Sequence, residues 1–247
     1  MRIAQIKYVP TKGNLKENHQ ILMELLESVS TESLDVVVTP ECFLDGYVCT
    51  EKYVTKDNIH EWAIDPRSST FTMDISAWAE SSGTWVILGC MRHDATGTYN
   101  TSLAFDRNGG FVGVYDKIHC QTHDKKFTPG NSLPIFDSDF GTFGMMICAD
   151  RRWPETVRTL SLKGAEIIFN PSYGMHDDKN LRMMQTRSYE SEVFIAFTHP
   201  QQSLITDPMG NILVNNEEQK KSVVISEIDI SIVNHSQSCS FRGIGSS

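Results

Sequence analysis

The sequence predicts an α/β protein in which β-sheets are covered by helices, within a single domain spanning residues 1–247. Strand and helix patterns alternate along the whole chain, two β-hairpin signals interrupt the alternation, and no linker, low-complexity segment or close repeat divides it. A purely doubly wound sheet would not need hairpins, so antiparallel pairs are expected beside the βα units. With 247 residues, 40% of them hydrophobic, the chain can bury a sizeable core.

The first part of the chain begins with a strand at residues 2–8 (RIAQIKY). A helix follows, indicated by an apolar stripe at Leu15, Ile21, Leu22, Leu25 and Leu26. Residues 34–41 (LDVVVTPE) form a continuous apolar run bounded by Pro40, which is typical of a strand buried on both faces. A helix over 70–81 and a strand over 84–90 (TWVILGC) come next.

The rest of the chain contains both hairpins. Residues 101–117 read as two strands around Asn108-Gly109-Gly110, a strong turn signal. Residues 143–148 (FGMMIC) form the next buried strand. The remaining predicted elements are a helix over 154–163 with Gly164 at its C-cap, a strand over 165–172, a helix over 179–192, a strand over 193–199, a hairpin over 203–214 and a closing strand over 221–230.

Composition excludes several classes of partner. The net charge is −9, and no run of Lys and Arg forms a basic stripe, which argues against nucleic acid and anionic membranes as partners. No apolar run approaches the ~18 residues that a membrane span needs, and the alternating N-terminal segment is not a signal peptide. We therefore expect a cytoplasmic protein.

The cysteines indicate free thiols in a reducing compartment. Six are scattered along the chain, which is not the density of a disulfide scaffold: Cys42, Cys49, Cys90, Cys120, Cys148 and Cys239. His119, Cys120 and His123 lie close in sequence, but their spacing fits no common zinc pattern, so no metal site is expected.

Three of the predicted buried strands end in a reactive side chain. Glu41 ends one strand, Lys117 follows another, and Cys148 lies between an apolar strand and the polar turn ADRRWPE. Residues at the ends of adjacent strands converge on one edge of a sheet, and an acid, an amine and a thiol gathered there suit nucleophilic catalysis. Each also has a structural reading: a buried core thiol, a loop acid and a solvated edge charge.

The chain resembles the nitrilase-like carbon–nitrogen hydrolases. The resemblance rests on TPECFLDGY around Glu41, VYDKIH around Lys117 and ICADRRWPE around Cys148, with supporting matches in FTPGN, FNPS and DPMGNIL. These segments occur in family order across nearly the whole chain. The resemblance implies a four-layer α-β-β-α sandwich with two mixed sheets, a homodimer or higher homo-oligomer, and a catalytic triad of Glu41, Lys117 and Cys148.

A finer resemblance concerns the substrate. Residues 150–158 (DRRWPETVR) and 162–168 (LKGAEII) look most like N-carbamoyl-D-amino acid amidohydrolases. In that group paired arginines hold the substrate carboxylate, and the matching positions are Arg151 and Arg152. The resemblance has departures: Ala149 stands where those enzymes carry a polar side chain, and the loop over 118–126 is shorter.

A second acid is also in question. The family places a second glutamate shortly before the FTPG-type segment, and here QTHDKKFTPG puts His123 or Asp124 at that place.

The reaction that these groups suit is amide hydrolysis through a thioester. Cleaving a linear amide needs a nucleophile, a proton donor for the leaving nitrogen and a stabiliser for the oxyanion. Glu41 is expected to act as general base toward Cys148, while Lys117 and the backbone N–H of Ala149 hold the oxyanion. No metal or organic cofactor is required.

Several alternatives stay open at this level. An N-carbamoyl amino acid is the favoured substrate, beside an ω-amide, an aliphatic amide or a nitrile. The changed second acid also allows a non-catalytic binder, and an acyltransferase would use another acceptor in place of water. Tyr47, Trp153 and Tyr173 are candidate pocket residues or plain packing, and one arginine could instead pair with Asp150 or Glu155 to fix the turn.

Overall fold

Two six-stranded β-sheets form the centre of the protein in a computed structural model, which describes residues 1–218 and 221–233. The first sheet has the order β12 (Ser222–Glu227), β1 (Arg2–Lys7), β2 (Val36–Val38), β3 (Trp85–Asp94), β4 (Gly97–Phe105) and β5 (Phe111–Asp116). The second has the order β11 (Ile212–Asn216), β10 (Gln202–Thr206), β9 (Phe194–His199), β8 (Ile167–Pro171), β7 (Gly141–Met145) and β6 (Ile135–Ser138).

Both sheets are mixed and follow the same plan. Strands β1, β2 and β3 are parallel, as are β7, β8 and β9. All other pairs of neighbouring strands in the two sheets are antiparallel. The two predicted hairpins appear as β4–β5 and β10–β11. At the other edge of the first sheet, β12 pairs with β1, and Arg2 lies opposite Glu227.

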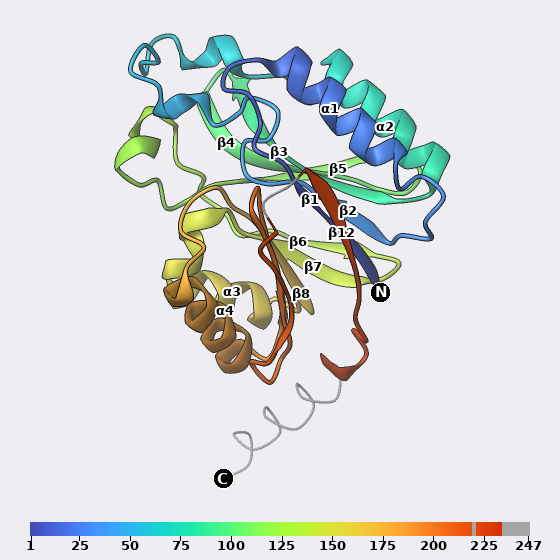
Figure 1. The fold of residues 1–247 in the computed structure, drawn as a ribbon. Helices are drawn as coiled ribbons and strands as arrows, with labels where there is room; N and C mark the ends of the chain where they lie inside the picture. Colours follow the sequence, from blue (N-terminus) through green and yellow to red (C-terminus); the bar gives the residue numbers. More distant parts are fainter. Residues whose placement is uncertain (219–220, 234–247) are drawn as a thin grey trace.

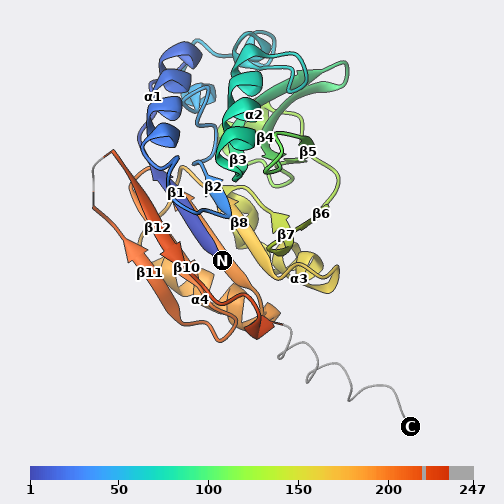
Figure 2. The same cartoon turned by 90° about the vertical axis from the view of Figure 1, so that its right-hand side faces the viewer.

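Four helices cover the outer faces of the sheets. Helices α1 (Leu15–Glu27) and α2 (Thr70–Ser82) lie side by side over the first sheet, and α3 (Pro154–Leu162) and α4 (Asp178–Ser191) lie against the second (Figures 1 and 2). The predicted four-layer α-β-β-α sandwich in a single domain is therefore confirmed. Within the described residues no helix is long and apolar enough to cross a membrane.

Three apolar layers hold the sandwich together. Ile3, Val38, Phe143 and Phe169 belong to the layer between the sheets. The α1 and α2 stripes pack on the first sheet in a second layer that includes Leu22, Leu26, Ile75 and Trp78, and a third layer on the second sheet includes Val157, Leu160 and Met184. Burial of this apolar surface is the main stabilising contribution.

The largest difference from the predicted elements lies at the second strand. The apolar run over 34–41 gives only the three residues of β2. Pairing ends there because Pro40 has no N–H to donate to the ladder. The chain then enters a buried loop that carries Glu41. Strand β6 was not predicted, because its four residues (IFDS) lie half-buried at a sheet edge and show no clear alternation.

Gly89 in β3 fixes the position of this loop. Its N–H donates to Thr39 Oγ1 at 2.8 Å, and its carbonyl accepts from the N–H of Leu44 at 3.2 Å. A Cβ atom at Gly89 would lie 2.2 Å from the carbonyl oxygen of Pro40. Only glycine allows the backbone before Glu41 to approach the strand this closely.

The same loop contains a buried carboxyl group at Asp45. Its Oδ1 accepts from the N–H of Tyr47 at 3.0 Å, and its Oδ2 has no partner among the described residues. Burial raises the pKa of Asp45 to about 8, although backbone N–H donors, including that of Tyr47, oppose the effect. The side chain is therefore protonated at neutral pH.

We predict that Gly89→Ala lowers the free energy of unfolding by at least ~2 kcal/mol, because the methyl group overlaps backbone atoms that have no room to move. Gly83→Ala is the matched control. Gly83 ends α2 with φ +63°, and no atom lies within 4 Å of its Cβ position, so its cost is the left-handed conformation alone, about 1 kcal/mol. Urea unfolding curves of both variants measure the difference, and equal losses would contradict the role given to Gly89.

We predict that Asp45→Asn removes part of the pH dependence of stability. Between the unfolded-state pKa of Asp, ~3.9, and the folded value of about 8, the folded protein retains a proton that the unfolded chain loses, so stability falls as pH rises through this window. Asn titrates in neither state. Urea unfolding at pH 5 and pH 8.5 is expected to show a smaller loss for Asp45→Asn than for wild type, whereas Asp57→Asn at an exposed site should keep the wild-type loss.

Candidate active site

The three predicted reactive residues come from both sheets. Glu41 follows β2 and Lys117 follows β5 in the first sheet, whereas Cys148 follows β7 in the second. The expectation that they end adjacent strands of one sheet is wrong, because β3 and β4 separate β2 from β5. Face-to-face packing of the two sheets brings the strand ends to one place instead.

A buried ion-pair network joins the acid and the amine. Lys117 Nζ donates to Glu41 Oε1 at 2.7 Å and to Asp124 Oδ2 at 2.7 Å, and all three side chains are at most 1% exposed. Asp124 lies in the 3₁₀ helix η3 (Thr122–Lys126). Of the two candidates for a second acid, Asp124 contacts Lys117, and His123 lies at the surface, where its ring makes a T-shaped contact with that of Tyr47.

The two oxygens of Glu41 have different surroundings. Oε1 accepts from both Lys117 Nζ and Asn100 Nδ2, the latter at 2.8 Å. Oε2 is buried and has no hydrogen-bond partner among the described residues. Asn100 was missed by the sequence reasoning, and a single asparagine next to a predicted strand gave no signal of this contact.

Cys148 lies on a tight turn between β7 and α3. Its φ is +45°, in the left-handed region, and it begins the 3₁₀ helix η4 (Cys148–Arg152). A non-glycine residue in this conformation is uncommon and is typical of functional sites. Ala149 follows in the first turn of η4, where backbone N–H groups have no acceptor within the helix.

The Asp150 carboxylate fixes this turn through four hydrogen-bond contacts. Its Oδ2 accepts from the N–H of Ile147 at 2.9 Å and from the hydroxyl of Tyr115 at 2.7 Å. Its Oδ1 lies 2.7 Å from His119 Nδ1 and accepts from the His119 N–H at 2.9 Å. The Asp150 carboxylate is thus occupied without an arginine, and the alternative of an Arg–Asp150 pair is not observed.

A small cavity of about 160 Å³ opens over Cys148. A Cβ atom added at Gly174 would lie 3.8 Å from the Cys148 sulfur, which is the nearest atom to that position. Basic groups line the cavity without any carboxylate. The lining residues are Tyr47, Lys117, Gln121, His123, Cys148, Ala149, Arg151, Arg152, Gly174 and Met175.

The two predicted arginines differ in their surroundings. Arg151 is buried: its Nε donates to Asn180 Oδ1 and its Nη2 to the carbonyl of Met175, both at 2.7 Å. Its Nη1 is buried and has no partner among the described residues. Arg152 is exposed at the mouth, where Nη1 donates to Gln121 Oε1 at 3.4 Å. Arg151 therefore holds the cavity wall, and the two N–H bonds of its Nη1 have no acceptor among the described residues.

The predicted aromatic residues occupy three different places. Tyr47 lines the cavity, and its hydroxyl donates to Asp124 Oδ1 at 2.8 Å. Tyr173 lies behind Tyr47, with ring centroids 5.1 Å apart, and is not a lining residue. Trp153 is partly exposed and is not a lining residue of the cavity. Its ring stacks on that of His119, with ring centroids 4.2 Å apart.

Electrostatics keep Lys117 charged. Burial disfavours its ammonium form, but the interactions with Glu41, Cys148 and Asp124 outweigh this and raise the pKa of Lys117 well above its ordinary value. Burial, together with Glu41, Asp124 and Cys148, raises the pKa of Tyr47, so its hydroxyl stays neutral and donates. The site therefore presents a permanent cation beside the thiol.

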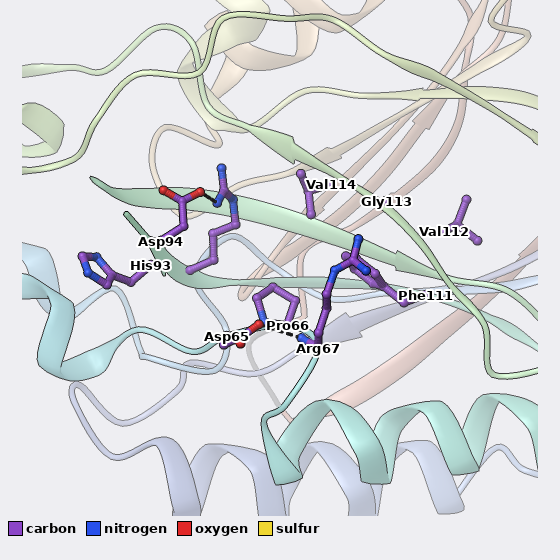
Figure 3. Close-up of a pocket in the computed structure, with 10 residues that line it drawn as sticks. Asp65, Pro66, Arg67, His93, Asp94, Phe111, Val112, Gly113 and Val114 are labelled. Atoms are coloured by element: carbon purple, nitrogen blue, oxygen red, sulfur yellow. Dashed lines mark hydrogen bonds and ion pairs between the residues drawn. The ribbon is translucent and has the colours of Figure 1, made fainter. Parts of the chain in front are cut away.

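A larger cavity, of about 520 Å³, lies elsewhere, between the end of β3, strand β5 and the loop before α2 (Figure 3). Its guanidinium groups are engaged, since Arg92 is bound to Asp94 and Asp116 and Arg67 lies over the ring of Phe111. It contains no thiol and none of the three reactive residues. The smaller cavity is therefore the candidate active site, because it contains Cys148 and Lys117 although it has the smaller volume.

Within the described residues no cluster of three His, Cys, Asp or Glu side chains could hold a metal ion. His119 is engaged by Asp150 and Trp153, and His123 lies against Tyr47. The described cysteines are free thiols. Cys239 lies outside the described residues.

Comparison with known proteins gives relatives that match most of the chain. The chain is 29% identical over 248 residues to a nitrilase of Pyrococcus abyssi (94% of this chain, 91% of the relative), and 23% identical over 263 residues to the omega-amidase NIT3 of Saccharomyces cerevisiae (94% and 88%).

Solved structures give the same fold. Saccharomyces cerevisiae Nit3, a member of the nitrilase superfamily, superposes with a TM-score of 0.82 at 21% identity, covering 98% of this chain and 95% of that one. An amidase from Nesterenkonia sp. AN1, solved with acrylamide added to its active-site cysteine, superposes with a TM-score of 0.78 at 17% identity, covering 96% and 97%. The model of the carbon-nitrogen hydrolase family matches residues 2–235. The chain therefore belongs to this family of nitrilase-related enzymes and is a carbon–nitrogen hydrolase.

Proposed function

We propose that this enzyme hydrolyses the amide bond of a small linear molecule that also carries a carboxylate, through a thioester on Cys148. The observation that carries the proposal is the cavity over Cys148, which is lined by Lys117, Arg151, Arg152 and His123 and by no acid. Lys117 is compensated by Glu41 and Asp124, but the hydrogen-bond partners of Arg151 and Arg152 among the described residues are neutral, so their positive charge favours an anionic ligand in a protein of net charge −9.

In the first half of the reaction Glu41 takes the thiol proton as Cys148 Sγ attacks the amide carbon. The carbonyl oxygen becomes an oxyanion, held by the Lys117 ammonium and the N–H of Ala149. Each such donor contributes about 3 kcal/mol to lowering the barrier. Glu41 then passes its proton to the nitrogen as the C–N bond breaks, and ammonia leaves.

In the second half water attacks the thioester. Glu41 takes a proton from the water as the new C–O bond forms, and the C–S bond breaks as the proton returns to the sulfur. The products are a carboxylic acid and the free thiol. The high pKa of Lys117 supports its role, because it never competes as a proton donor or acceptor at neutral pH.

Asp124 takes the place of the second acid in this mechanism. It is one methylene shorter than glutamate, but η3 brings its carboxylate to 2.7 Å from Lys117 Nζ. Its other oxygen is bound by the Tyr47 hydroxyl. Asp124 therefore holds the ammonium in place, which supports an enzyme over a non-catalytic binder.

The preferred substrate is the ω-amide of a short dicarboxylic acid. The cavity is small beside the ~300–1,000 Å³ of pockets for larger ligands, and the free Nη1 of Arg151 suits a carboxylate at the far end of such a molecule. An N-carbamoyl amino acid, which the DRRWPETVR segment favours, has the same two groups and is the second candidate. The relatives described above are named nitrilase, omega-amidase and amidase, and this supports the ω-amide.

We predict that Cys148→Ala abolishes ammonia release from succinamate, and that iodoacetamide labels Cys148 faster than the other cysteines. Burial raises the pKa values of Cys42, Cys49 and Cys90, and raises that of Cys120 to about 12, so these thiols are poor nucleophiles at neutral pH. Peptide mass spectrometry measures the labelling, and Cys120→Ala is the matched control with activity retained. Turnover by Cys148→Ala would refute the thioester.

We predict that the ratio of kcat/KM for succinamate to that for neutral butyramide exceeds one and falls by about 10- to 100-fold in Arg151→Met, because a charged hydrogen bond contributes about 1.5–3 kcal/mol. The neutral amide controls for damage to the cavity wall, since such damage lowers both rates. Arg152→Met, at the exposed mouth, is expected to lower the ratio only a few-fold. An unchanged ratio in both variants would count against an anionic substrate. A higher kcat/KM for N-carbamoylglycine than for succinamate would favour the second candidate.

A further inference from the structure

Asn100 contacts both members of the buried acid–amine pair and lines no part of the cavity. Its side-chain Nδ2 donates to Glu41 Oε1 at 2.8 Å, and its main-chain carbonyl accepts from the N–H of Lys117 at 2.9 Å. It is 1% exposed and lies within β4, between two neighbouring strands. Its position is therefore fixed by the sheet.

The contact makes the two oxygens of Glu41 unequal. Oε1 accepts from Asn100 and from Lys117, whereas Oε2 is buried with no partner among the described residues. A buried carboxylate oxygen without a donor is costly and needs a functional reason. The amide orientation of Asn100 follows from the same contact, because the reversed amide would place Oδ1 against the carboxylate.

We propose that Asn100 is a positioning residue that holds Glu41 through Oε1 and so leaves Oε2 as the atom that exchanges protons with Cys148 and the substrate. The inference rests on the proposed role of Glu41 as general base. An amide suits the task because it orients the carboxylate without adding a second cation, which would weaken the base. Lys117 alone could not fix the orientation, since its ammonium is shared with Asp124.

The test uses Asn100→Leu, which keeps the branching of the side chain at Cγ but removes the donor. A donated hydrogen bond favours the ionised carboxylate. Without it, the pH at which the iodoacetamide reaction of Cys148 reaches half its plateau is expected to rise by roughly 0.5–1 unit. In succinamate hydrolysis kcat is expected to fall by about 10- to 100-fold with KM little changed, because Asn100 does not touch the substrate.

Asn18→Leu is the matched control. Asn18 is also fully buried, and its Nδ2 donates to the main-chain carbonyls of Thr11 and Leu44 instead of to the Glu41 carboxylate, so the variant controls for the loss of a buried amide that also supports the Glu41 loop. It is expected to lower the melting temperature without moving the half-plateau pH. If Asn100→Leu does not fold, Asn100→Ser, which is too short to reach Glu41, replaces it.

The outcomes separate two failures. A half-plateau pH unchanged in Asn100→Leu, or moved equally in Asn18→Leu, would overturn the positioning role even with normal turnover. A moved half-plateau pH in a protein that turns over no amide would support the positioning role and reject the proposed function, since alkylation needs no turnover.

Discussion

The Lys117 ammonium, held between two buried carboxylates, is the interaction on which the site depends. A lysine that is 1% exposed would lose its charge if it stood alone. Glu41 and Asp124 each bind it at 2.7 Å, and together with the Cys148 sulfur they keep it charged. Removing either acid would leave an imperfectly compensated charge in the interior, so the carboxylates stabilise the fold whatever part they take in the proposed reaction.

The strand ends that carry chemistry were predictable, but the way in which they meet was not. Glu41, Lys117 and Cys148 each end or follow an apolar run, and that pattern is visible in the sequence. Which strands are neighbours depends on packing between sheets, and no local pattern encodes it. The contact of Asn100 with Glu41 and the choice of Asp124 over His123 likewise need coordinates, because side chains adjacent in sequence along η3 point in different directions.

The substrate motif illustrates the same limit at a finer level. The sequence names both arginines as candidates for the substrate carboxylate and does not say which of them faces the pocket. In the structure Arg151 is buried and fixes the wall through Asn180 and Met175, while Arg152 lies at the mouth. Burial sets the worth of a charged contact, so one guanidinium is expected to discriminate strongly and the other weakly. The motif indicates a carboxylate ligand, and the structure shows that the two arginines have different surroundings.

The pairing of β12 with β1 has a consequence for how the enzyme is made. One edge of β1 stays open during synthesis until the ribosome has released β12, because Arg2 pairs with Glu227. Such distant pairing closes slowly and leaves a strand edge open to other nascent chains. The order of synthesis thus delays completion of the first sheet until β12 has left the ribosome, and chaperones would help most before that point.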